Sequence, residues 1–203
     1  MRLTVVAGTC GSGKTALISA AADRIGKRMS FIANNPESEQ MLMDRCEHTD
    51  NFPFKSPCAR VRQFRYRYDL MKERSPELLV CEPPGNCLEL SSPMINPIYV
   101  SDRKTVSIGP LITVVRPDDL RKGMNGKTVD GLRLRNMVDE SDVIAVSFSE
   151  GVPDNERSRM VCEIGLVNPD AEVVFFSLSD GEGIGRIAEL IEQKGDYTRP
   201  LFN

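Results

Sequence analysis

The segment G-T-C-G-S-G-K-T near the N-terminus constrains the fold of this chain more than any other feature. It satisfies the spacing G-x-x-x-x-G-K-[ST] through Gly8, Gly13, Lys14 and Thr15. The apolar residues 3–6 precede it, and a segment rich in alanine, leucine and isoleucine follows it. A strand, a glycine-rich turn and a helix in this order predict a phosphate-binding loop.

Each residue type in this motif has a chemical role. Glycines let backbone amides approach phosphate oxygens closely, and the start of the following helix adds partial positive charge. The Lys14 ammonium would neutralise the β- and γ-phosphates, and the Thr15 hydroxyl would bind Mg²⁺. We therefore expect a nucleoside triphosphate (GTP or ATP) to lie against the backbone of Gly8, Gly11, Ser12 and Gly13.

Short apolar runs alternate with amphipathic segments along the chain. Continuous apolar character predicts strands that are buried on both faces of a parallel sheet. The predicted strands are residues 3–6, 29–33, 78–81, 108–115, 143–148 and 173–178. The predicted helices are residues 14–25, 37–46, 61–72, 132–138, 156–166 and 184–193, and the predicted loops are residues 50–57 and 82–97. This alternation favours an α/β fold with a doubly wound, mostly parallel sheet in three α/β/α layers, as a single P-loop NTPase domain over residues 1–203.

Composition excludes several classes of protein. The chain is 40% hydrophobic and 27% charged, which is ordinary for a globular domain, and its net charge of −3 gives no basic surplus for nucleic acid. No apolar run reaches the ~18 residues needed to cross a bilayer, and residues 1–7 fit a strand rather than a signal peptide. We therefore expect a cytoplasmic protein with reduced cysteines that binds neither nucleic acid nor membrane. Residues 60–74 combine basic and aromatic side chains, which fits either a solvated helix face or a basic docking surface.

A carboxylate follows the predicted strand at residues 78–81. Glu82 comes directly after this strand, and Gly85 follows after two prolines. Parallel strands end at one edge of a sheet, so Glu82 should lie near the phosphate loop, where it can hold Mg²⁺ through water or orient the attacking water. The Gly85 amide should approach the γ-phosphate. Asn34 and Asn35 follow another predicted strand and either face the nucleotide or form a turn.

Three segments of the chain occur together in a known family. They are the phosphate loop, the E-P-P-G-N segment that begins at Glu82, and the S-L-S-D-G-E-G-I segment that begins at Ser177. In this order they resemble the metallochaperone GTPases: the nickel-insertion GTPase of hydrogenase maturation, the urease accessory GTPase and the cobalamin-synthesis-W-like proteins. The resemblance covers most of the chain and is weakest at residues 35–69.

The resemblance implies a function, cofactors and partners. It implies Mg²⁺-dependent GTP hydrolysis that drives metal or cofactor insertion into a client metalloenzyme, alone or with that enzyme's maturation factors. It also implies a nucleotide-dependent homodimer, and a contact between Ser177 and the nucleotide base. Nickel or zinc would be the metal that such a protein carries.

The chain departs from that family at the motif that recognises guanine. The family's N-K-x-D motif is matched here by Ser147, Phe148, Ser149 and Glu150. Glu150 is the candidate to replace the aspartate that pairs with guanine, and Phe148 either stacks on the base or belongs to the core. A site that lacks one hydrogen-bonding partner loses discrimination steeply, so binding of ATP stays open.

The cysteine motif by which the family binds metal is also reduced. Cys58 lies where the family has its metal ligands, and Cys87 follows the E-P-P-G-N segment. A closed zinc or nickel site needs about four nitrogen or sulfur ligands. The dimer that the resemblance implies suggests the hypothesis that two chains each supply Cys58 and Cys87. The alternative is that both cysteines are small buried hydrophobic residues.

Two functions from different classes fit this sequence. One is a slow NTPase whose catalytic residues would be Lys14, Glu82 and Gly85. The other is a nucleotide-gated binding module, a scaffold for a partner enzyme that hydrolyses little nucleotide itself. A small-molecule kinase fits less well, because arginines such as Arg116 are scattered along the chain and no acceptor base is evident.

Overall fold

The computed structural model describes residues 1–52, 61–85, 90–124 and 127–193. Within these ranges seven strands form one parallel sheet in the order β3-β2-β4-β1-β5-β6-β7. They are β1 (Arg2–Gly8), β2 (Met29–Ala33), β3 (His48–Asn51), β4 (Leu78–Cys81), β5 (Ser107–Val115), β6 (Val143–Val146) and β7 (Glu172–Phe175). The predicted doubly wound α/β class is confirmed, and every pair of neighbouring strands described is parallel.

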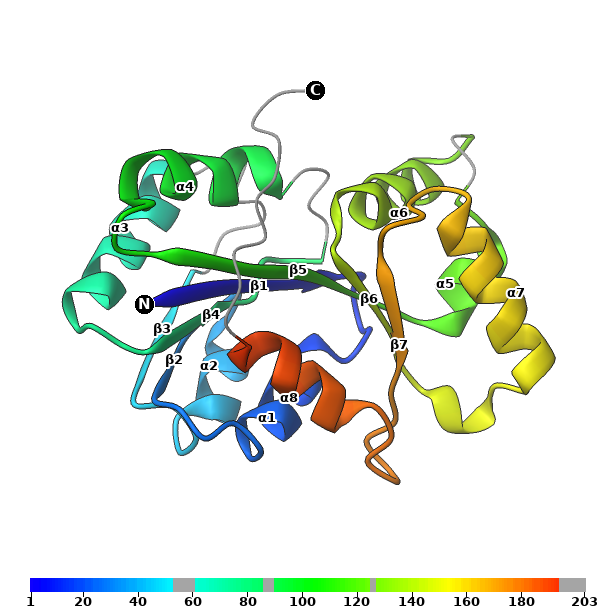
Figure 1. Cartoon of the computed structure of the whole chain (residues 1–203), viewed down its shortest axis with the longest axis horizontal. Coiled ribbons are helices and arrows are strands. Elements are labelled where there is room, and N and C mark those ends of the chain that lie inside the picture. The colour runs from blue at the N-terminus through cyan, green and yellow to red at the C-terminus, as the bar shows by residue number, and fades with distance from the viewer. Residues whose placement is uncertain (53–60, 86–89, 125–126, 194–203) are drawn as a thin grey trace.

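Helices cover both faces of the sheet (Figure 1). They are α1 (Lys14–Ala22), α2 (Pro36–Leu42), α3 (Val61–Glu73), α4 (Asn96–Asp102), α5 (Pro117–Lys122), α6 (Val129–Glu140), α7 (Asp154–Gly165) and α8 (Ile184–Glu192). Alternate strand residues belong to different clusters: Val6 and Val114 pack with α1, α2 and α8, whereas Val5 and Val115 pack with the other helices. None of the helices in the described ranges is long and apolar enough to cross a membrane.

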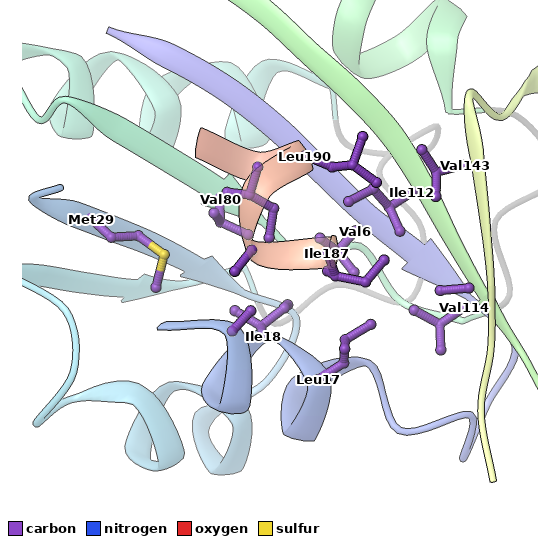
Figure 2. Packing of buried hydrophobic residues seen from close by; sticks show 14 of the residues in the cluster. Val6, Leu17, Ile18, Met29, Val80, Ile112, Val114, Val143, Ile187 and Leu190 are labelled. Carbon is purple, nitrogen blue, oxygen red and sulfur yellow. The ribbon is translucent and has the colours of Figure 1, made fainter. Parts of the chain in front are cut away.

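One core cluster holds the helix that follows the phosphate loop (Figure 2). Leu17 and Ile18 of α1, together with Ile187 and Leu190 of α8, are at most 1% exposed. They share this cluster with the strand residues Val6, Val80, Ile112, Val114 and Val143. Burying an aliphatic side chain of this size contributes about 1.5–3 kcal/mol. The core therefore fixes the position of α1, and with it the end of the loop.

The structure corrects both predicted loops. Residues 50–57 overlap β3, a strand of polar residues that pairs with β2 at the edge of the sheet, where apolar patterning gives no signal. Residues 82–97 include a short π-helix (Ser91–Ile95) and the start of α4. Pro97 fits the first turn of α4 because a backbone N–H, which proline lacks, would have no acceptor within the helix there. Helix α5 was also missed, because Leu120 is the one aliphatic residue among its six residues and gives no apolar period. Parts of both segments lie outside the described residues.

Helix α3 contains most of the basic segment at residues 60–74. Its aromatic residues Phe64 and Tyr68 are buried in the core. Arg65 and Lys72 both form ion pairs with Asp102, a residue that is 8% exposed. Much of the positive charge of α3 is therefore used inside the fold, which favours a packed helix face over a free docking surface.

Candidate functional site

The phosphate loop connects β1 to α1 at the carboxyl edge of the sheet. Gly8, Gly11 and Gly13 have positive φ angles of 145°, 69° and 88°. A Cβ atom at Gly8 would lie 2.0 Å from the carbonyl oxygen of Val114, so the neighbouring strand β5 leaves no room for a side chain. The loop therefore needs glycine at this position for a steric reason as well as a conformational one.

The side chain of Lys14 lies against the same loop. It is 7% exposed, and its ammonium donates hydrogen bonds to the carbonyl oxygens of Thr9 at 3.0 Å and Gly8 at 3.4 Å. These contacts hold the ammonium at the start of α1, where backbone amides and the helix dipole favour a phosphate group.

A group of polar side chains meets at the next residue. The Thr15 hydroxyl donates to a Glu82 carboxylate oxygen at 2.7 Å and lies 2.9 Å from the Ser38 hydroxyl. The Asn34 amide donates to the other Glu82 oxygen. The segments after β1, β2 and β4 can supply these groups together because β4 lies between β1 and β2 in the sheet. Sequence reasoning missed Ser38, whose signal is its place in the first turn of α2.

Glu82 is a buried carboxylate in this group. It is 4% exposed, and burial raises its pKa above the usual range, although its contacts with Thr15 and Asn34 and the charge of Lys14 act the other way. A carboxylate and hydroxyl oxygens are hard donors, which are the ligands that Mg²⁺ prefers. A cation would also relieve the cost of ionising a buried acid. The donor set therefore fits magnesium.

Gly85 brings the loop after β4 against the phosphate loop. A Cβ atom at Gly85 would lie 2.7 Å from the backbone nitrogen of Cys10 and 2.9 Å from the carbonyl carbon of Thr9. A larger residue at this position would have to push the two loops apart. The close approach explains the glycine in the E-x-x-G segment without reference to a ligand.

A cavity of about 740 Å³ opens between these loops. Small-molecule sites in proteins commonly have volumes of about 300–1,000 Å³. The lining residues are Cys10, Gly11, Gly13, Lys14, Thr15, Ala16, Asn34, Asn35, Ser38, Met41, Glu82, Pro84 and Gly85. Most of the residues predicted for the phosphates and Mg²⁺ thus share one cavity, while Gly8 and Ser12 are buried within the loop.

The loops after β6 and β7 form a separate polar network. The Arg157 guanidinium of α7 donates to the Glu182 carboxylate at 2.5 Å and 3.0 Å, and to the Ser149 carbonyl oxygen at 2.7 Å. The Ser149 hydroxyl also donates to Glu182. These groups satisfy one another and tie the two loops together. The sequence did not single out this pair, because the two residues lie 25 positions apart and meet only through the pairing of β6 with β7.

Glu150 and Ser177, which are predicted to contact the base, lie around this network, as does Ser147, the first residue of the segment that replaces N-K-x-D. Ser147 is buried and donates to the Val115 carbonyl oxygen, and Ser177 is buried with its hydroxyl 2.8 Å from that of Ser179. Glu150 lies in a short 3-10 helix and is exposed. Neither Glu150 nor Ser177 is among the described residues that line the phosphate-loop cavity. The structure therefore brings these two residues to the same sheet edge but not into that cavity.

Phe148 does not belong to the core. Its side chain is 52% exposed, and its backbone has a positive φ of 55°, which is rare for an aromatic residue. Of the two alternatives predicted for Phe148, the structure excludes burial in the core. Its ring lines a small cavity beside α5 together with Arg116 and Arg121.

The predicted nickel or zinc ligands, Cys58 and Cys87, lie outside the described residues. Within the described part of the chain, no group of three or more histidine, cysteine or acidic residues is placed to hold a metal ion. Cys81 is fully buried, and burial raises the pKa of its thiol, so it behaves as a small hydrophobic residue. A cysteine metal site shared between two chains therefore stays a prediction.

A comparison with protein families finds a match over most of the chain. The model described as "CobW/HypB/UreG, nucleotide-binding domain" matches residues 2–175. These residues include the phosphate loop, Glu82, Gly85 and Glu150. A search of curated proteins finds no match.

Solved structures share the fold at low sequence identity. The hydrogenase maturation factor HypB from Archaeoglobus fulgidus has a TM-score of 0.66 and 17% identity, covering 93% of this chain and 87% of its own. HypB from Helicobacter pylori in complex with nickel has a TM-score of 0.66 and 14% identity, covering 92% and 83%. The Zn(II)-bound YjiA GTPase from E. coli has a TM-score of 0.58 and 15% identity, covering 98% and 67%. At these identities the likeness shows the fold alone.

Proposed function

This chain belongs to the CobW/HypB/UreG nucleotide-binding family, and from that premise we propose that it is a Mg²⁺-dependent GTPase. Its cycle of GTP binding and hydrolysis would drive insertion of a metal or cofactor into a client enzyme in the cytoplasm. The observation that carries this proposal is the 2.7 Å hydrogen bond between Thr15 and Glu82, inside a cavity that Lys14 also lines.

The cavity residues have separate proposed roles. The backbone at residues 8–15 and the Lys14 ammonium hold the triphosphate, and Thr15 and Glu82 hold Mg²⁺. When bound, magnesium neutralises phosphate charge. During hydrolysis Lys14 stabilises the charge that develops on the phosphate oxygens, Glu82 orients the attacking water, and the Gly85 amide donates to the γ-phosphate. Because Glu82 is buried and hydrogen-bonded, its carboxylate is held in place, which supports its role as the acceptor for the attacking water.

We propose that the base is recognised only weakly. Glu150 is our candidate acceptor for the guanine donors because it is exposed after β6, and Ser177 lies on the neighbouring loop. Glu182, on the loop after β7, is already paired with Arg157. A single acceptor in place of the family's paired side chains gives a modest preference for GTP over ATP.

Metal delivery is the part of the proposal that rests on the family. One solved HypB structure contains nickel, and the solved YjiA structure contains zinc. For this chain we propose that Cys58 and Cys87 from two copies hold the cargo metal in a nucleotide-dependent homodimer. Metal analysis of the purified dimer tests this, with Cys58→Ala as the variant and Cys162→Ala, an exposed cysteine elsewhere, as the control. A metal content that does not change in Cys58→Ala would contradict it.

A steady-state hydrolysis assay separates the GTPase from a nucleotide-gated scaffold. Phosphate release from GTP and ATP is measured for the wild type, for Lys14→Ala, and for Lys27→Ala, a lysine paired with Glu192 away from the site. The proposal predicts turnover that is lost in Lys14→Ala only. Tight GTP binding without turnover in the wild type would instead support the scaffold.

A further inference from the structure

The nucleotide cavity holds a second hydroxyl group beside that of Thr15. Ser38 lies in the first turn of α2, is 6% exposed and lines the same cavity. Its hydroxyl oxygen is 2.9 Å from the hydroxyl oxygen of Thr15. Two hydroxyl groups from segments 23 residues apart therefore meet at one point of the cavity wall.

The start of α2 does not explain why a serine stands at this position. The Asn35 side chain caps the helix by accepting from the Ser38 backbone N–H at 2.8 Å. The third helical position, which Ser38 occupies, favours glutamate or glutamine, because their side chains can reach back to the cap. The Ser38 hydroxyl takes no part in this cap, and its one hydrogen-bond partner among the described residues is Thr15. The hydroxyl group therefore has a role outside the helix.

The hydrogen bonds of Thr15 fix the direction of this contact. Thr15 donates its single hydroxyl proton to Glu82 at 2.7 Å, so Ser38 is the donor to Thr15. Each hydroxyl oxygen has two lone pairs, and the Ser38 oxygen accepts no hydrogen bond from the described residues. A cation that attracts a lone pair from each oxygen can therefore take the place of the hydrogen bond between them.

The separation of the two oxygens suits magnesium. Mg²⁺ binds six oxygens at about 2.0–2.1 Å in near-ideal octahedral geometry, which places adjacent oxygens about 2.9 Å apart. The hydroxyl oxygens of Thr15 and Ser38 are themselves 2.9 Å apart. They therefore already have the separation of two neighbouring ligands of one magnesium ion.

Few other side chains of the cavity can complete such a site. Besides Thr15 and Ser38, the described lining has side-chain oxygens only on Asn34, Asn35 and Glu82. The Asn34 side-chain oxygen accepts from the Asn35 amide, and the Asn35 side-chain oxygen accepts from the Ser38 N–H. With Glu82 as the one carboxylate, Mg²⁺ needs neutral oxygens as further ligands. The Ser38 hydroxyl is the neutral group of this lining, besides Thr15, whose oxygen is best placed to serve.

We propose that Ser38 is a second hydroxyl ligand of the nucleotide-bound Mg²⁺, beside Thr15. This inference rests on the proposed Mg²⁺-dependent GTPase and adds a ligand from α2 to those from the phosphate loop and from the segment after β4. Ser38 would then tie the start of α2 to the phosphate loop whenever Mg²⁺ and GTP are bound, because its backbone is held by the cap residue Asn35.

Magnesium titration of nucleotide binding tests this ligand. The affinity for a fluorescent GTP analogue is measured against free Mg²⁺, and again with a chelator, for the wild type, Ser38→Ala and Ser38→Thr. We expect Ser38→Ala to raise the Mg²⁺ concentration at half effect about tenfold, while its affinity in chelator matches the wild type. Ser38→Thr keeps the hydroxyl and should stay near the wild type. Glu37→Gln, an exposed neighbour that does not line the cavity, is the control.

A cysteine variant separates a magnesium ligand from a residue that only orients Thr15. Sulfur is a soft ligand, so Ser38→Cys should shift the metal preference from Mg²⁺ toward Cd²⁺ relative to the wild type, which has Cys10 in the same cavity. An unchanged Mg²⁺ requirement in Ser38→Ala, an equal loss of affinity with and without Mg²⁺, or no shift toward Cd²⁺ in Ser38→Cys would overturn the inference and leave the proposed GTPase intact. A wild type whose GTP affinity does not depend on Mg²⁺ would overturn both.

Discussion

At the phosphate loop, polar side chains converge on a cavity: Lys14, Thr15 and Glu82 all line it. At the loops after β6 and β7, polar side chains converge on one another, as Arg157 and Glu182 do. Both regions lie at the same edge of one parallel sheet. The difference teaches that a phosphate site depends mainly on backbone shape and strand order. Base recognition instead depends on a few side chains, which after substitution can pair with one another and no longer face a ligand.

Removal of the Lys14 ammonium should have the largest effect on nucleotide binding at the phosphate loop. We expect Lys14→Ala to weaken GTP binding roughly 100-fold, because hydrogen bonds to charged groups contribute about 1.5–3 kcal/mol each. Titration with a fluorescent GTP analogue measures the change, and Lys27→Ala is the matched control. An affinity in Lys14→Ala within about threefold of the wild type would contradict the assignment.

Glu82 gives the phosphate region a pH dependence. Burial raises its pKa in the folded state, so its contribution to stability is present at acidic pH and is lost as the pH rises through that pKa. Magnesium needs the ionised carboxylate, so Mg²⁺ affinity should rise with pH over the same window. Glu82→Gln should weaken Mg²⁺ binding about tenfold and remove this dependence. Magnesium titrations at acidic and neutral pH are the measurement, and a pH-independent wild type would count against the idea.

The base region should discriminate weakly between nucleotides. Sites that pair fully with a polar ligand group reject analogues by about 10⁴-fold or more, so we expect a GTP-to-ATP affinity ratio below about 100. Glu150→Gln should bring this ratio near one without changing the contribution of the triphosphate. Competition of both nucleotides against one fluorescent analogue measures the ratio. A wild-type ratio above about 10⁴ would show that the base is fully hydrogen-bonded after all.

A change in the Arg157–Glu182 pair should affect stability rather than ligand binding. Hydrogen bonds from Arg157 and Ser149 hold the pKa of Glu182 below its usual range, so the stabilisation is present at neutral pH and is lost as the pH falls through the folded-state pKa. Both side chains are partly exposed, so we expect Arg157→Met to lower the free energy of unfolding by only about 1 kcal/mol.

Urea unfolding at neutral and acidic pH measures this change. The matched control is Arg159→Met, because Arg159 forms an exposed pair with Glu163 on the same helix. A loss of the same size at both pH values would mean that the charge of Glu182 is not the cause. A large loss of GTP affinity in Arg157→Met would mean that the network belongs to the binding site.

The sequence could predict the phosphate region but not the contacts at the loops after β6 and β7. The glycine spacing and the apolar strands identify the fold class and the segments that meet at the phosphate loop, because parallel strands end at one edge. Apolar patterning could not reveal β3, whose four residues are all polar, or α5, whose six residues include one aliphatic side chain, Leu120. Nor could it pair Arg157 with Glu182, because that contact depends on two side chains from distant segments rather than on any local pattern.

The measurement that tests the central claim most directly is calorimetric titration of GTP into the wild-type protein, with Mg²⁺ and then with a chelator. The account predicts binding at one site per chain that weakens when magnesium is removed, since Thr15 and Glu82 meet at 2.7 Å beside the phosphate loop. Absence of GTP uptake with Mg²⁺ present, or uptake of equal strength without magnesium, would contradict it.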